Sequence, residues 1–212
     1  MTSHYFNPDP DTPHKTATID LVLPDLHLTL TTDRGVFSPD RIDLGTRILL
    51  ETAPPPPQHG TLLDIGCGYG PIALTMAKRA PDATVLGLDV NNRALALART
   101  NATAHALTNT RFRHITPDAT PTPDQEPDTP QLLTGPFAAI WSNPPIRVGK
   151  PILHTLLRTW LGRLAPGAHA HLVVHKNLGA DSLQRWLDTN NHPATRIATR
   201  AGYRILRTTN NT

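Results

Sequence analysis

The 212-residue chain has little of three kinds of residue: one cysteine, Cys67, 5% aromatic residues and 17% charged residues. A single cysteine excludes an intrachain disulfide and any zinc site built from several thiolates. With 38% hydrophobic residues, the low charge also excludes a charge-rich disordered chain and a coiled coil. No apolar run approaches the ~18 residues of a membrane span. We therefore expect a globular protein with a core of its own.

Targeting signals are lacking as well. The N-terminal stretch, MTSHYFNPDPDTPHKT, has neither the basic region nor the apolar region of a secretory signal peptide. Together with the single cysteine, this favours a reducing, cytoplasmic location and no membrane partner. A chain of this length buries about 70% of its unfolded surface, which is enough for one α/β domain.

Charge is distributed unevenly along the chain. From Trp141 to the C-terminus, ten Arg and Lys residues stand against two Asp residues, a balance of +8, whereas the first 140 residues balance to −5. This asymmetry predicts one positive face and a polyanionic partner. The alternative is that abundant arginine and proline reflect the base composition of the genome.

Prolines divide the chain into segments. The 22 prolines are about twice the average share. Residues 54–57 are four consecutive prolines, typical of a stiff connector, so we expect an extension over residues 1–57 and the main domain over residues 58–212. A second proline- and aspartate-rich stretch, residues 116–136, has few apolar anchors and predicts a long exposed loop.

Hydrophobic periodicity predicts a hairpin over residues 16–32 and a helix over residues 41–52. From residue 61 onward, strand-like and helix-like runs alternate, which is typical of a mostly parallel sheet covered by helices. The expected strands are 62–65, 84–88, 111–115, 138–141 and 169–175, and the expected helices are 71–79, 93–105, 151–163 and 180–190. The last two strand-like runs, 195–199 and 203–208, have so short a link that only an antiparallel pair is possible.

A glycine loop follows the first strand of this alternating region. Gly66, Gly68 and Gly70 alternate ahead of Pro71, a residue well suited to the first turn of a helix. Asp89 stands at the tip of the next strand, where an acid accepts hydrogen bonds from two ribose hydroxyls. This combination is shared by nicotinamide and adenosine cofactors, and its structural alternative is a tight turn with an incidental acid.

The spacing of the loop departs from that of dinucleotide-binding proteins. It is G-x-G-x-G preceded by Asp64, rather than G-x-G-x-x-G. With no diphosphate to bind, an acid beside the loop is tolerated and can hold the cationic amino group of a bound amino acid. These features fit S-adenosylmethionine.

The sequence Asn143-Pro144-Pro145 comes directly after the fourth strand, at the edge where open α/β sheets bind ligands. The prolines fix the backbone and remove amide donors, so acceptors dominate. The Asn143 side-chain oxygen and the Pro144 carbonyl can jointly accept both protons of a substrate amino group, which favours its nucleophilic form. On this basis Asn143→Asp is expected to keep some activity. The alternative is a simple proline turn after a strand.

These motifs, together with Ile146–Lys150 and the run from Lys176 to Ala180, resemble the small-domain class I S-adenosylmethionine-dependent methyltransferases, which include bacterial 16S ribosomal RNA guanine-N2 methyltransferases. The similarity covers nearly the whole chain. It implies a Rossmann-like α/β fold with a seven-stranded, mostly parallel sheet, a C-terminal antiparallel hairpin and a short N-terminal hairpin and helix.

The resemblance also implies roles for individual residues. By it, Asp89 and Asn91 bind the ribose, Asp118 lies at the adenine edge, and an upstream segment closes over the cofactor. The full expected cofactor set is Asp64, Gly66, Cys67, Gly68, Gly70, Asp89, Asn91, Asp118, Asn143, Phe37 and Thr46. The expected catalytic set is Asn143, Pro144, Pro145 and Ile146, and the expected substrate-binding set is Arg147, Lys150 and Lys176.

Several departures from the family pattern bear on the substrate. The ribosomal guanine enzymes usually carry a duplicated N-terminal domain, and this sequence has no counterpart of it. Ile146 stands where many amino-methyltransferases place an aromatic residue, which leaves Tyr5, Phe6 and Phe37 as candidates for stacking. The proline-rich stretch leaves open whether Asp118 or Asp124 reaches the adenine.

Other residues carry less functional signal. Cys67 lies inside the glycine loop and is badly placed for covalent attack on a base, which argues against carbon methylation. His169, His171 and His175 share one strand-like run that has no carboxylate, so we expect polar residues on an exposed face and no metal. Trp160 and Trp186 are expected in the core.

The sequence therefore predicts a methyltransferase for an exocyclic amine of a nucleobase, with guanine-N2 in small-subunit ribosomal RNA first and the ribosomal RNA or subunit as partner. An adenine amine and a protein glutamine amide present the same –NH₂ beside a π-system. A binding module without catalysis would not need the Asn143-Pro144-Pro145 sequence, and a nicotinamide dehydrogenase would need a second domain.

Overall fold

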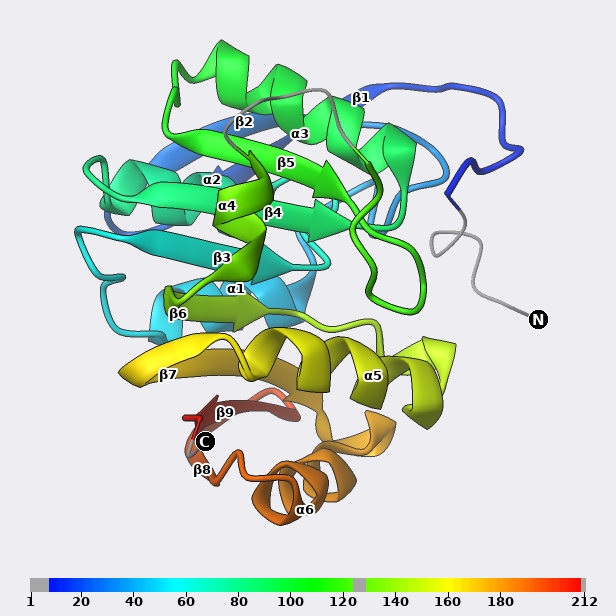
Figure 1. Cartoon of the computed structure of the whole chain (residues 1–212). Coiled ribbons are helices and arrows are strands. Elements are labelled where there is room, and N and C mark those ends of the chain that lie inside the picture. The colour runs from blue at the N-terminus through cyan, green and yellow to red at the C-terminus, as the bar shows by residue number, and fades with distance from the viewer. Residues whose placement is uncertain (1–7, 124–128, 211–212) are drawn as a thin grey trace.

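The computed structural model describes residues 8–123 and 129–210. Its centre is a seven-stranded sheet in the order β5-β4-β3-β6-β7-β9-β8, shown in Figure 1. The first five strands of this order pair in parallel, and β9 pairs antiparallel with both β7 and β8. The fold class expected from the sequence is confirmed.

The strands of this sheet begin and end close to the expected positions. They are β3 (Thr61–Ile65), β4 (Thr84–Asp89), β5 (Thr110–His114), β6 (Phe137–Ser142), β7 (Leu164–His175), β8 (Ala194–Arg200) and β9 (Tyr203–Thr208). The largest difference is at β7, which begins at Leu164, five residues before the expected start. Its first residue pairs with Phe137, and the register then shifts before His169 pairs with Ala139.

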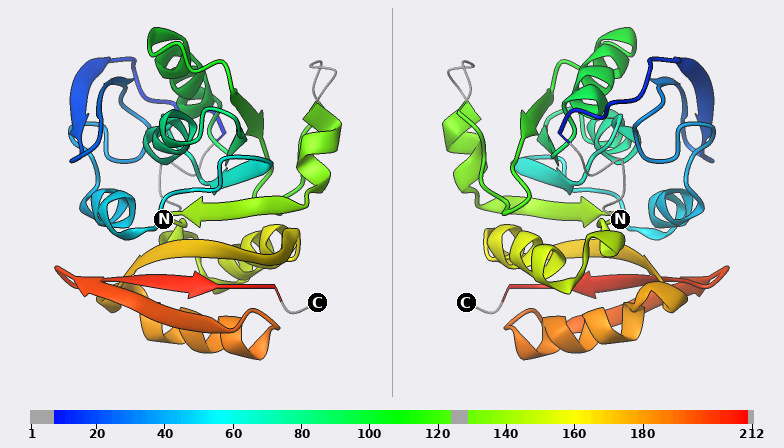
Figure 2. Two further views of the ribbon diagram at one scale, coloured as in Figure 1. Left: turned by 90° about the vertical axis from the view of Figure 1, so that its left-hand side faces the viewer. Right: turned by 90° about the vertical axis from the view of Figure 1, so that its right-hand side faces the viewer.

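Helices cover both faces of the sheet, as Figure 2 shows. One face carries α1 (Leu44–Thr52), α2 (Pro71–Arg79) and α3 (Asn92–Ala104), and the other carries α4 (Thr129–Thr134), α5 (Lys150–Leu161) and α6 (Ala180–Thr189). Each layer buries its own cluster of apolar side chains against the sheet. This three-layer arrangement leaves the carboxyl edge of the parallel strands free for a ligand.

A separate two-stranded sheet lies outside the first helix layer. It consists of β1 (Ala17–Val22) and β2 (His27–Thr32), paired antiparallel from Ala17–Thr32 to Val22–His27. Asn101 of α3 binds the backbone of Thr31 in both directions, accepting from its N–H at 2.8 Å and donating to its carbonyl at 2.9 Å. The hairpin is thus joined to the helix that borders the carboxyl edge.

The proline-rich stretch 116–136 is only partly the exposed loop that the sequence predicts. Ala119 is buried, and Ile115 forms an isolated β-bridge with Pro121. Helix α4 then brings Leu132 and Leu133 against the core on the face of the sheet that also carries α5. Two adjacent leucines were enough to anchor a short helix, a signal that the surrounding prolines obscured.

The expectations for the tryptophans are confirmed and that for His171 is wrong. Trp160 is fully buried, and Trp186, which is half-buried, packs against the core and stacks on His154 with ring centroids 4.1 Å apart. His171 is only 3% exposed, whereas the sequence favoured an exposed face for it. It lies on β7 beside Trp141, with which it makes an edge-to-face contact.

No helix in the described residues combines the length and apolar character needed to cross a membrane. Within the same residues, no three His, Cys, Asp or Glu side chains come together as metal ligands would.

Candidate cofactor and acceptor site

An open cavity lies at the carboxyl edge of β3, β4 and β6. Its empty space is about 870 Å³, including the part open to solvent. The residues around it come from the glycine loop, the ends of the strands, the start of α1 and the turn after β6. They are Phe37, Asp43, Thr46, Gly66, Cys67, Gly68, Tyr69, Pro71, Ile72, Asp89, Val90, Asn91, Ala94, Ile115, Asn143, Pro144, Pro145 and Leu156.

The glycine loop forms the floor of this cavity. The backbone N–H groups of Gly66 and Cys67 both donate to the carbonyl of Leu88, at 2.8 and 2.9 Å, so the loop is joined to β4. Gly68 has φ +56°, and a Cβ there would meet no described atom within 4 Å, because the position faces open space. The backbone therefore presents an unobstructed surface to a ligand. Gly70 caps α2 but does not line the cavity.

Asp89 connects the loop to the next helix. Its Oδ2 accepts from the N–H of Gly68 at 2.7 Å, and its Oδ1 accepts from the N–H of Asn91 at 2.9 Å. Burial raises the pKa of Asp89, while these hydrogen bonds act in the opposite direction. The carboxylate lines the cavity, in a position to accept hydrogen bonds from ribose hydroxyls.

Asp64, expected at the amino group of the cofactor, does not line the cavity. It is fully buried beneath the loop, where its Oδ2 accepts from the N–H of Ala73 at 3.0 Å. Its Oδ1 has no hydrogen-bond partner among the described residues. Burial raises the pKa of this carboxyl well above its usual range. Asp64 therefore contacts α2 and is not exposed in the cavity.

Asn91 and Phe37 both lie in the cavity wall, as expected. The Asn91 side chain accepts from the N–H of Ala94 at 3.0 Å, which caps α3, and donates to the carbonyl of Gly35 at 2.9 Å. The second bond draws the loop that carries Phe37 towards the cavity. A contact with α3 thus helps to place the loop.

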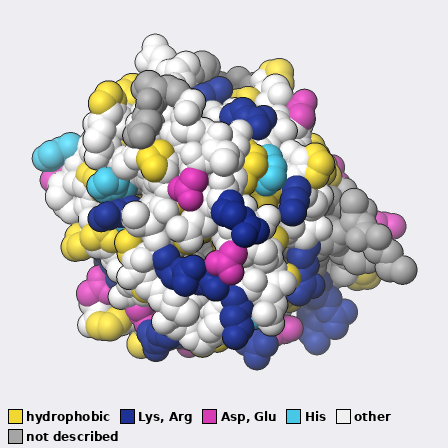
Figure 3. Space-filling model, turned by 90° about the horizontal axis from the view of Figure 1, so that it is seen from below, with side chains coloured by type: hydrophobic (Ala, Val, Ile, Leu, Met, Phe, Trp, Pro, Cys, Tyr) yellow, Lys and Arg dark blue, Asp and Glu magenta, His cyan; other side chains and the backbone are white. Residues whose placement is uncertain are grey.

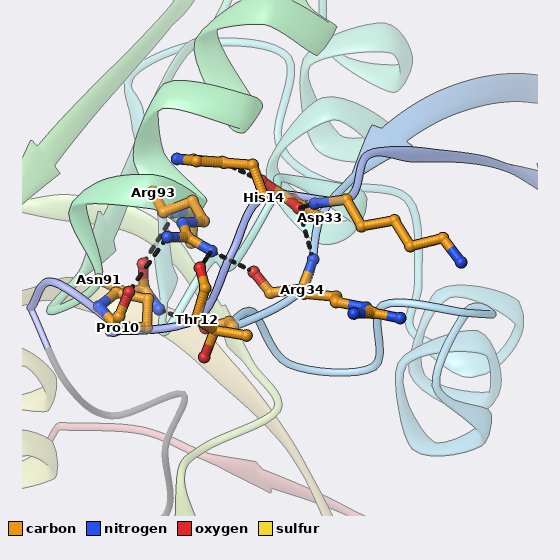
Figure 4. A network of polar contacts seen from close by, with 10 residues as sticks. Pro10, Thr12, His14, Asp33, Arg34, Asn91 and Arg93 are labelled. Atoms are coloured by element: carbon orange, nitrogen blue, oxygen red, sulfur yellow. Dashed lines mark hydrogen bonds and ion pairs between the residues drawn. The ribbon is translucent and has the colours of Figure 1, made fainter.

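Arg93 strengthens this attachment, as Figure 4 shows. Its guanidinium donates to three backbone carbonyls, those of Arg34 at 2.7 Å, Thr12 at 2.8 Å and Pro10 at 3.1 Å. Asp33, beside the same loop, accepts from His14 and from two backbone N–H groups. The N-terminal segment and the loop that carries Phe37 are thus held together against the start of α3.

Asp118, expected at the adenine, is exposed and does not line the cavity. It accepts from the hydroxyl of Thr116 and from the N–H of Thr120, so it closes its own turn. Hydrogen bonds from these two threonines lower the pKa of Asp118. Asp124, the other candidate, lies outside the described residues. The cavity wall near Asp89 is instead apolar, formed by Val90, Ala94 and Ile115.

The turn after β6 forms the opposite wall. Asn143, Pro144 and Pro145 all line the cavity, whereas Ile146 begins a short 3₁₀ helix (Ile146–Val148) and packs against the core. The carbonyl of Pro144 accepts from the N–H of Ile146 at 2.8 Å, which fixes the turn. The structure thus brings the Asn-Pro-Pro sequence and the glycine loop to one cavity.

The start of α1 contributes two further polar residues. The Nδ2 of Asn143 donates to Asp43 Oδ2 at 2.8 Å and to Thr46 Oγ1 at 3.1 Å. Thr46 was expected in the cofactor set, but Asp43, Tyr69 and Ile72 were not singled out from the sequence. Asp43 stands three residues before Thr46, the spacing of a helix cap, and that signal was available in the sequence.

The expected substrate-binding cations lie at the same edge of the sheet but outside the cavity. Arg147 and Lys150 follow the Asn-Pro-Pro turn, and Lys176 follows the end of β7 in a second short 3₁₀ helix (Lys176–Leu178). All three are exposed, and none has an acidic partner within 4.0 Å in the described part of the chain.

Comparison with known proteins decides the family. The family model described as methyltransferase small domain matches residues 27–207. The chain belongs to the methyltransferase small domain family. Members of this family take the methyl group from S-adenosylmethionine, and the chain is an S-adenosylmethionine-dependent methyltransferase.

Two relatives show the range of this family. The chain is 31% identical over 207 residues to the uncharacterized protein YbxB of Bacillus subtilis, with 98% of both proteins covered. It is 32% identical over 139 residues to ribosomal RNA small subunit methyltransferase C of Aeromonas hydrophila, which covers 66% of this chain and 36% of that protein. The chain therefore spans about a third of the length of this ribosomal RNA methyltransferase.

Solved structures confirm the fold. The Thermus thermophilus 16S rRNA N2 G1207 methyltransferase, determined in complex with AdoMet and guanosine, superposes with a TM-score of 0.74 at 22% identity. The match covers 95% of this chain and 52% of that one. TrmN from Thermus thermophilus matches with a TM-score of 0.60 at 26% identity, over 78% of this chain and 48% of that one.

The residues of the cavity fit S-adenosylmethionine. Gly66 and Gly68 both have positive φ, 74° and 56°, and offer a backbone surface without side chains. Asp89, Val90 and Ile115 line the cavity, so Asp89 would offer acceptors to ribose hydroxyls, and Ile115 with Val90 would form an apolar wall for a purine. When bound, S-adenosylmethionine supplies an electrophilic methyl group on a sulfonium.

Proposed function

We propose that this methyltransferase modifies an exocyclic amine of a nucleobase in ribosomal RNA, with the N2 amine of guanine in the small-subunit RNA as its target. The observation that carries the proposal is that Asn143 and Pro144 line the same cavity as the glycine loop and Asp89. Hydrogen-bond acceptors of Asn143 and Pro144 thus lie beside the part of the cavity that fits S-adenosylmethionine.

The chemistry of an exocyclic amine explains why two hydrogen-bond acceptors at this place would promote methyl transfer. Its lone pair is delocalised into the ring, so the amine is a weak nucleophile. Hydrogen bonds from its two N–H groups to Asn143 Oδ1 and to the Pro144 carbonyl favour the pyramidal form, in which the lone pair is available. S-adenosylmethionine held by the glycine loop and Asp89 would supply the methyl group: the lone pair would form the N–C bond, the electrons of the S–C bond would stay with sulfur, and the nitrogen would lose one proton to solvent. The chain's contribution is positioning and electrostatics.

The comparisons support ribosomal RNA as the substrate class. The Aeromonas hydrophila relative is named as a small-subunit ribosomal RNA methyltransferase, and the Thermus thermophilus enzyme is described as acting at N2 of a guanine in 16S rRNA. The large-subunit methyltransferase G of Shewanella oneidensis, 30% identical over 162 residues, belongs to the same group of relatives.

Surface charge supports a polyanionic partner. Figure 3 views the molecule from below, the side of α6 and β8, and shows many Lys and Arg side chains with fewer acidic ones between them. Exposed members of this C-terminal set include Arg185, Arg196, Arg200 and Arg207. Two of them have acidic partners, Arg196 with Asp181 and Arg200 with Glu51. The remaining positive charge favours binding to phosphates.

The decisive experiment is mass spectrometry of ribosomal RNA nucleosides from a deletion strain and its parent. We expect one N2-methylguanosine of the small-subunit RNA to be missing from the deletion strain and restored by the parental gene. Loss of an N6-methyladenosine instead would assign an adenine amine. Unchanged RNA together with an unmethylated protein glutamine would overturn the RNA substrate.

A further inference from the structure

We infer that Asp43 is a positioning residue for methyl transfer: with Thr46 it fixes the side-chain amide of Asn143 so that its oxygen, and not its nitrogen, faces the acceptor amine. This inference rests on the proposed function, in which Asn143 accepts a hydrogen bond from that amine. Asp43 belongs neither to the glycine loop nor to the Asn-Pro-Pro turn, so its role does not follow from either motif.

The hydrogen bonds around Asn143 carry the inference. An asparagine amide has two N–H hydrogens and one acceptor oxygen. Its Nδ2 makes two bonds, to Asp43 Oδ2 at 2.8 Å and to Thr46 Oγ1 at 3.1 Å, so both hydrogens are committed to α1 and its cap. Oδ1 is the remaining polar atom of a side chain that lines the cavity.

The carboxylate decides between the two orientations of the amide. An ionised aspartate accepts hydrogen bonds and donates none. Rotating the Asn143 amide by 180° would place Oδ1 against Asp43 Oδ2, with two acceptors in contact and no hydrogen between them. A hydroxyl alone, such as that of Thr46, would tolerate either orientation because it both donates and accepts. Asp43 is therefore the group that selects the orientation.

Asp43 is itself held firmly. Its Oδ2 caps α1 by accepting from the N–H of Thr46 at 3.0 Å, and its backbone carbonyl accepts from the N–H of Arg47 at the same distance. The helix start is pressed against β9, because a Cβ at Gly45 would lie 2.6 Å from the ring of Tyr203. The C-terminal hairpin thus supports α1, which supports Asp43, which orients Asn143.

This arrangement bears on one expectation from the sequence. Asn143→Asp was expected to keep some activity, since a carboxylate also accepts from an amine. In the structure the new carboxylate would stand against Asp43 at the distance of the present 2.8 Å bond. Two carboxylates at that separation do not both ionise, so the pair either holds a proton or separates. A shared proton leaves the second oxygen of the new carboxyl facing the cavity as an acceptor, whereas separation moves that acceptor away, so the variant is expected to keep only part of the parental kcat.

The test is a pair of variants, Asp43→Ala and Asp43→Asn. In Asp43→Asn the amide oxygen, held by the N–H of Thr46, takes the place of Oδ2 and still accepts from Asn143. In Asp43→Ala no acceptor is left there, so the Asn143 amide is free to turn. We expect Asp43→Ala to lower kcat at least tenfold with S-adenosylmethionine affinity within about threefold of the parent, and Asp43→Asn to keep kcat within about threefold. Asp40→Ala, which removes an exposed acid in the preceding loop, is the matched control.

A measurement without substrate separates this inference from the proposed function. The side-chain amide protons of Asn143, assigned in the ¹⁵N NMR spectrum by their loss in Asn143→Asp, are expected to exchange slowly in the parent, in Asp40→Ala and in Asp43→Asn, and rapidly in Asp43→Ala. Equal exchange in the parent and Asp43→Ala, or an Asp43→Asn variant with a kcat as low as that of Asp43→Ala, would overturn the role of Asp43. Slow exchange in a parent that methylates no RNA amine would instead support the Asp43 contact and overturn the proposed function.

Discussion

The guanidinium of Arg93 donates a 2.7 Å hydrogen bond to the backbone carbonyl of Arg34. The two residues are far apart in sequence, and their contact holds the loop that carries Phe37 against the start of α3. Phe37 lines the cavity although its side chain is 40% exposed, so its position depends on this loop.

Replacing Arg93 is therefore expected to weaken cofactor binding. Arg93→Lys keeps the charge but loses the fork of donors that reaches three carbonyls, so the loop is freer to move. We expect S-adenosylmethionine to bind about tenfold more weakly, mainly through faster dissociation, as measured by stopped-flow fluorescence or calorimetry. Arg99→Lys is the matched control, because Arg99 lies on the same helix and donates to the carbonyl of Phe112, away from the loop. Equal dissociation rates for the two variants would refute the role of Arg93.

Asp89 is expected to be the strongest single determinant of cofactor affinity. Asp89→Ala removes the acceptors for the ribose and also releases the N–H groups of Gly68 and Asn91. The expected loss is about 2–3 kcal/mol, roughly a hundredfold in affinity. Calorimetry measures it directly, with thermal unfolding as a check that the variant folds. Unchanged affinity would show that the cofactor lies elsewhere.

His171 is expected to make stability depend on pH. Burial lowers its pKa from 6.5 to about 4, with the positive charges of His169 and Arg207 acting in the same direction. Neither ring nitrogen has a hydrogen-bond partner among residues 8–123 and 129–210. Because the unfolded chain binds this proton more readily, the stabilisation is complete above pH 6.5 and is lost as pH falls towards 4.

The loss amounts to about 3 kcal/mol at most, from the conversion of pKa units to free energy. Urea unfolding of the parent, His171→Leu and His59→Gln between pH 7 and 4.5 measures it. We expect the free energy of unfolding of the first variant to vary less with pH than that of the parent. The second variant, at an exposed position, is expected to show the same pH dependence as the parent. A parent whose stability is constant over this range would contradict a buried neutral histidine.

RNA binding is expected to depend on the exposed cations at the cavity edge. Replacing Arg147, Lys150 and Lys176 together by Gln removes three charges that have no acidic partner in the described residues. We expect weaker RNA binding and a shallower dependence of affinity on salt, because fewer counterions are released. Lys78→Gln is the control, since this exposed lysine lies on α2, away from the three cations. If binding by the parent hardly varies with salt, a protein substrate is favoured instead.

The fold was largely predictable because its signals are local. The alternation of strands and helices, the short link before Tyr203 and the glycine loop each depend on neighbours in sequence. Helix α2 begins and ends at the expected residues, Pro71 and Arg79. The helix over 129–134 was missed because its two leucines stand among prolines, where periodicity gives little signal.

Residues of the candidate site were predictable only where they belong to a sequence motif. Asp89, Asn143 and Thr46 are in the cavity wall as expected, but Asp64 and Asp118 are not, because an acid beside a loop can equally cap a helix or close a turn. The contact of Asp43 with Asn143 joins residues 100 positions apart, so no local pattern reveals it. Long-range contacts of this kind decide which polar atoms remain for a substrate.

The central claim is that the Asn143 side chain acts on the acceptor amine and not on the cofactor. The most direct test is methyl transfer by Asn143→Ala from labelled S-adenosylmethionine to ribosomes, ribosomal subunits and naked RNA, measured beside cofactor affinity. We expect affinity to stay within about threefold of the parent and turnover to fall about a hundredfold or more, the scale of losing one preorganised polar partner. An Asn143→Ala variant that methylates as fast as the parent would contradict the account.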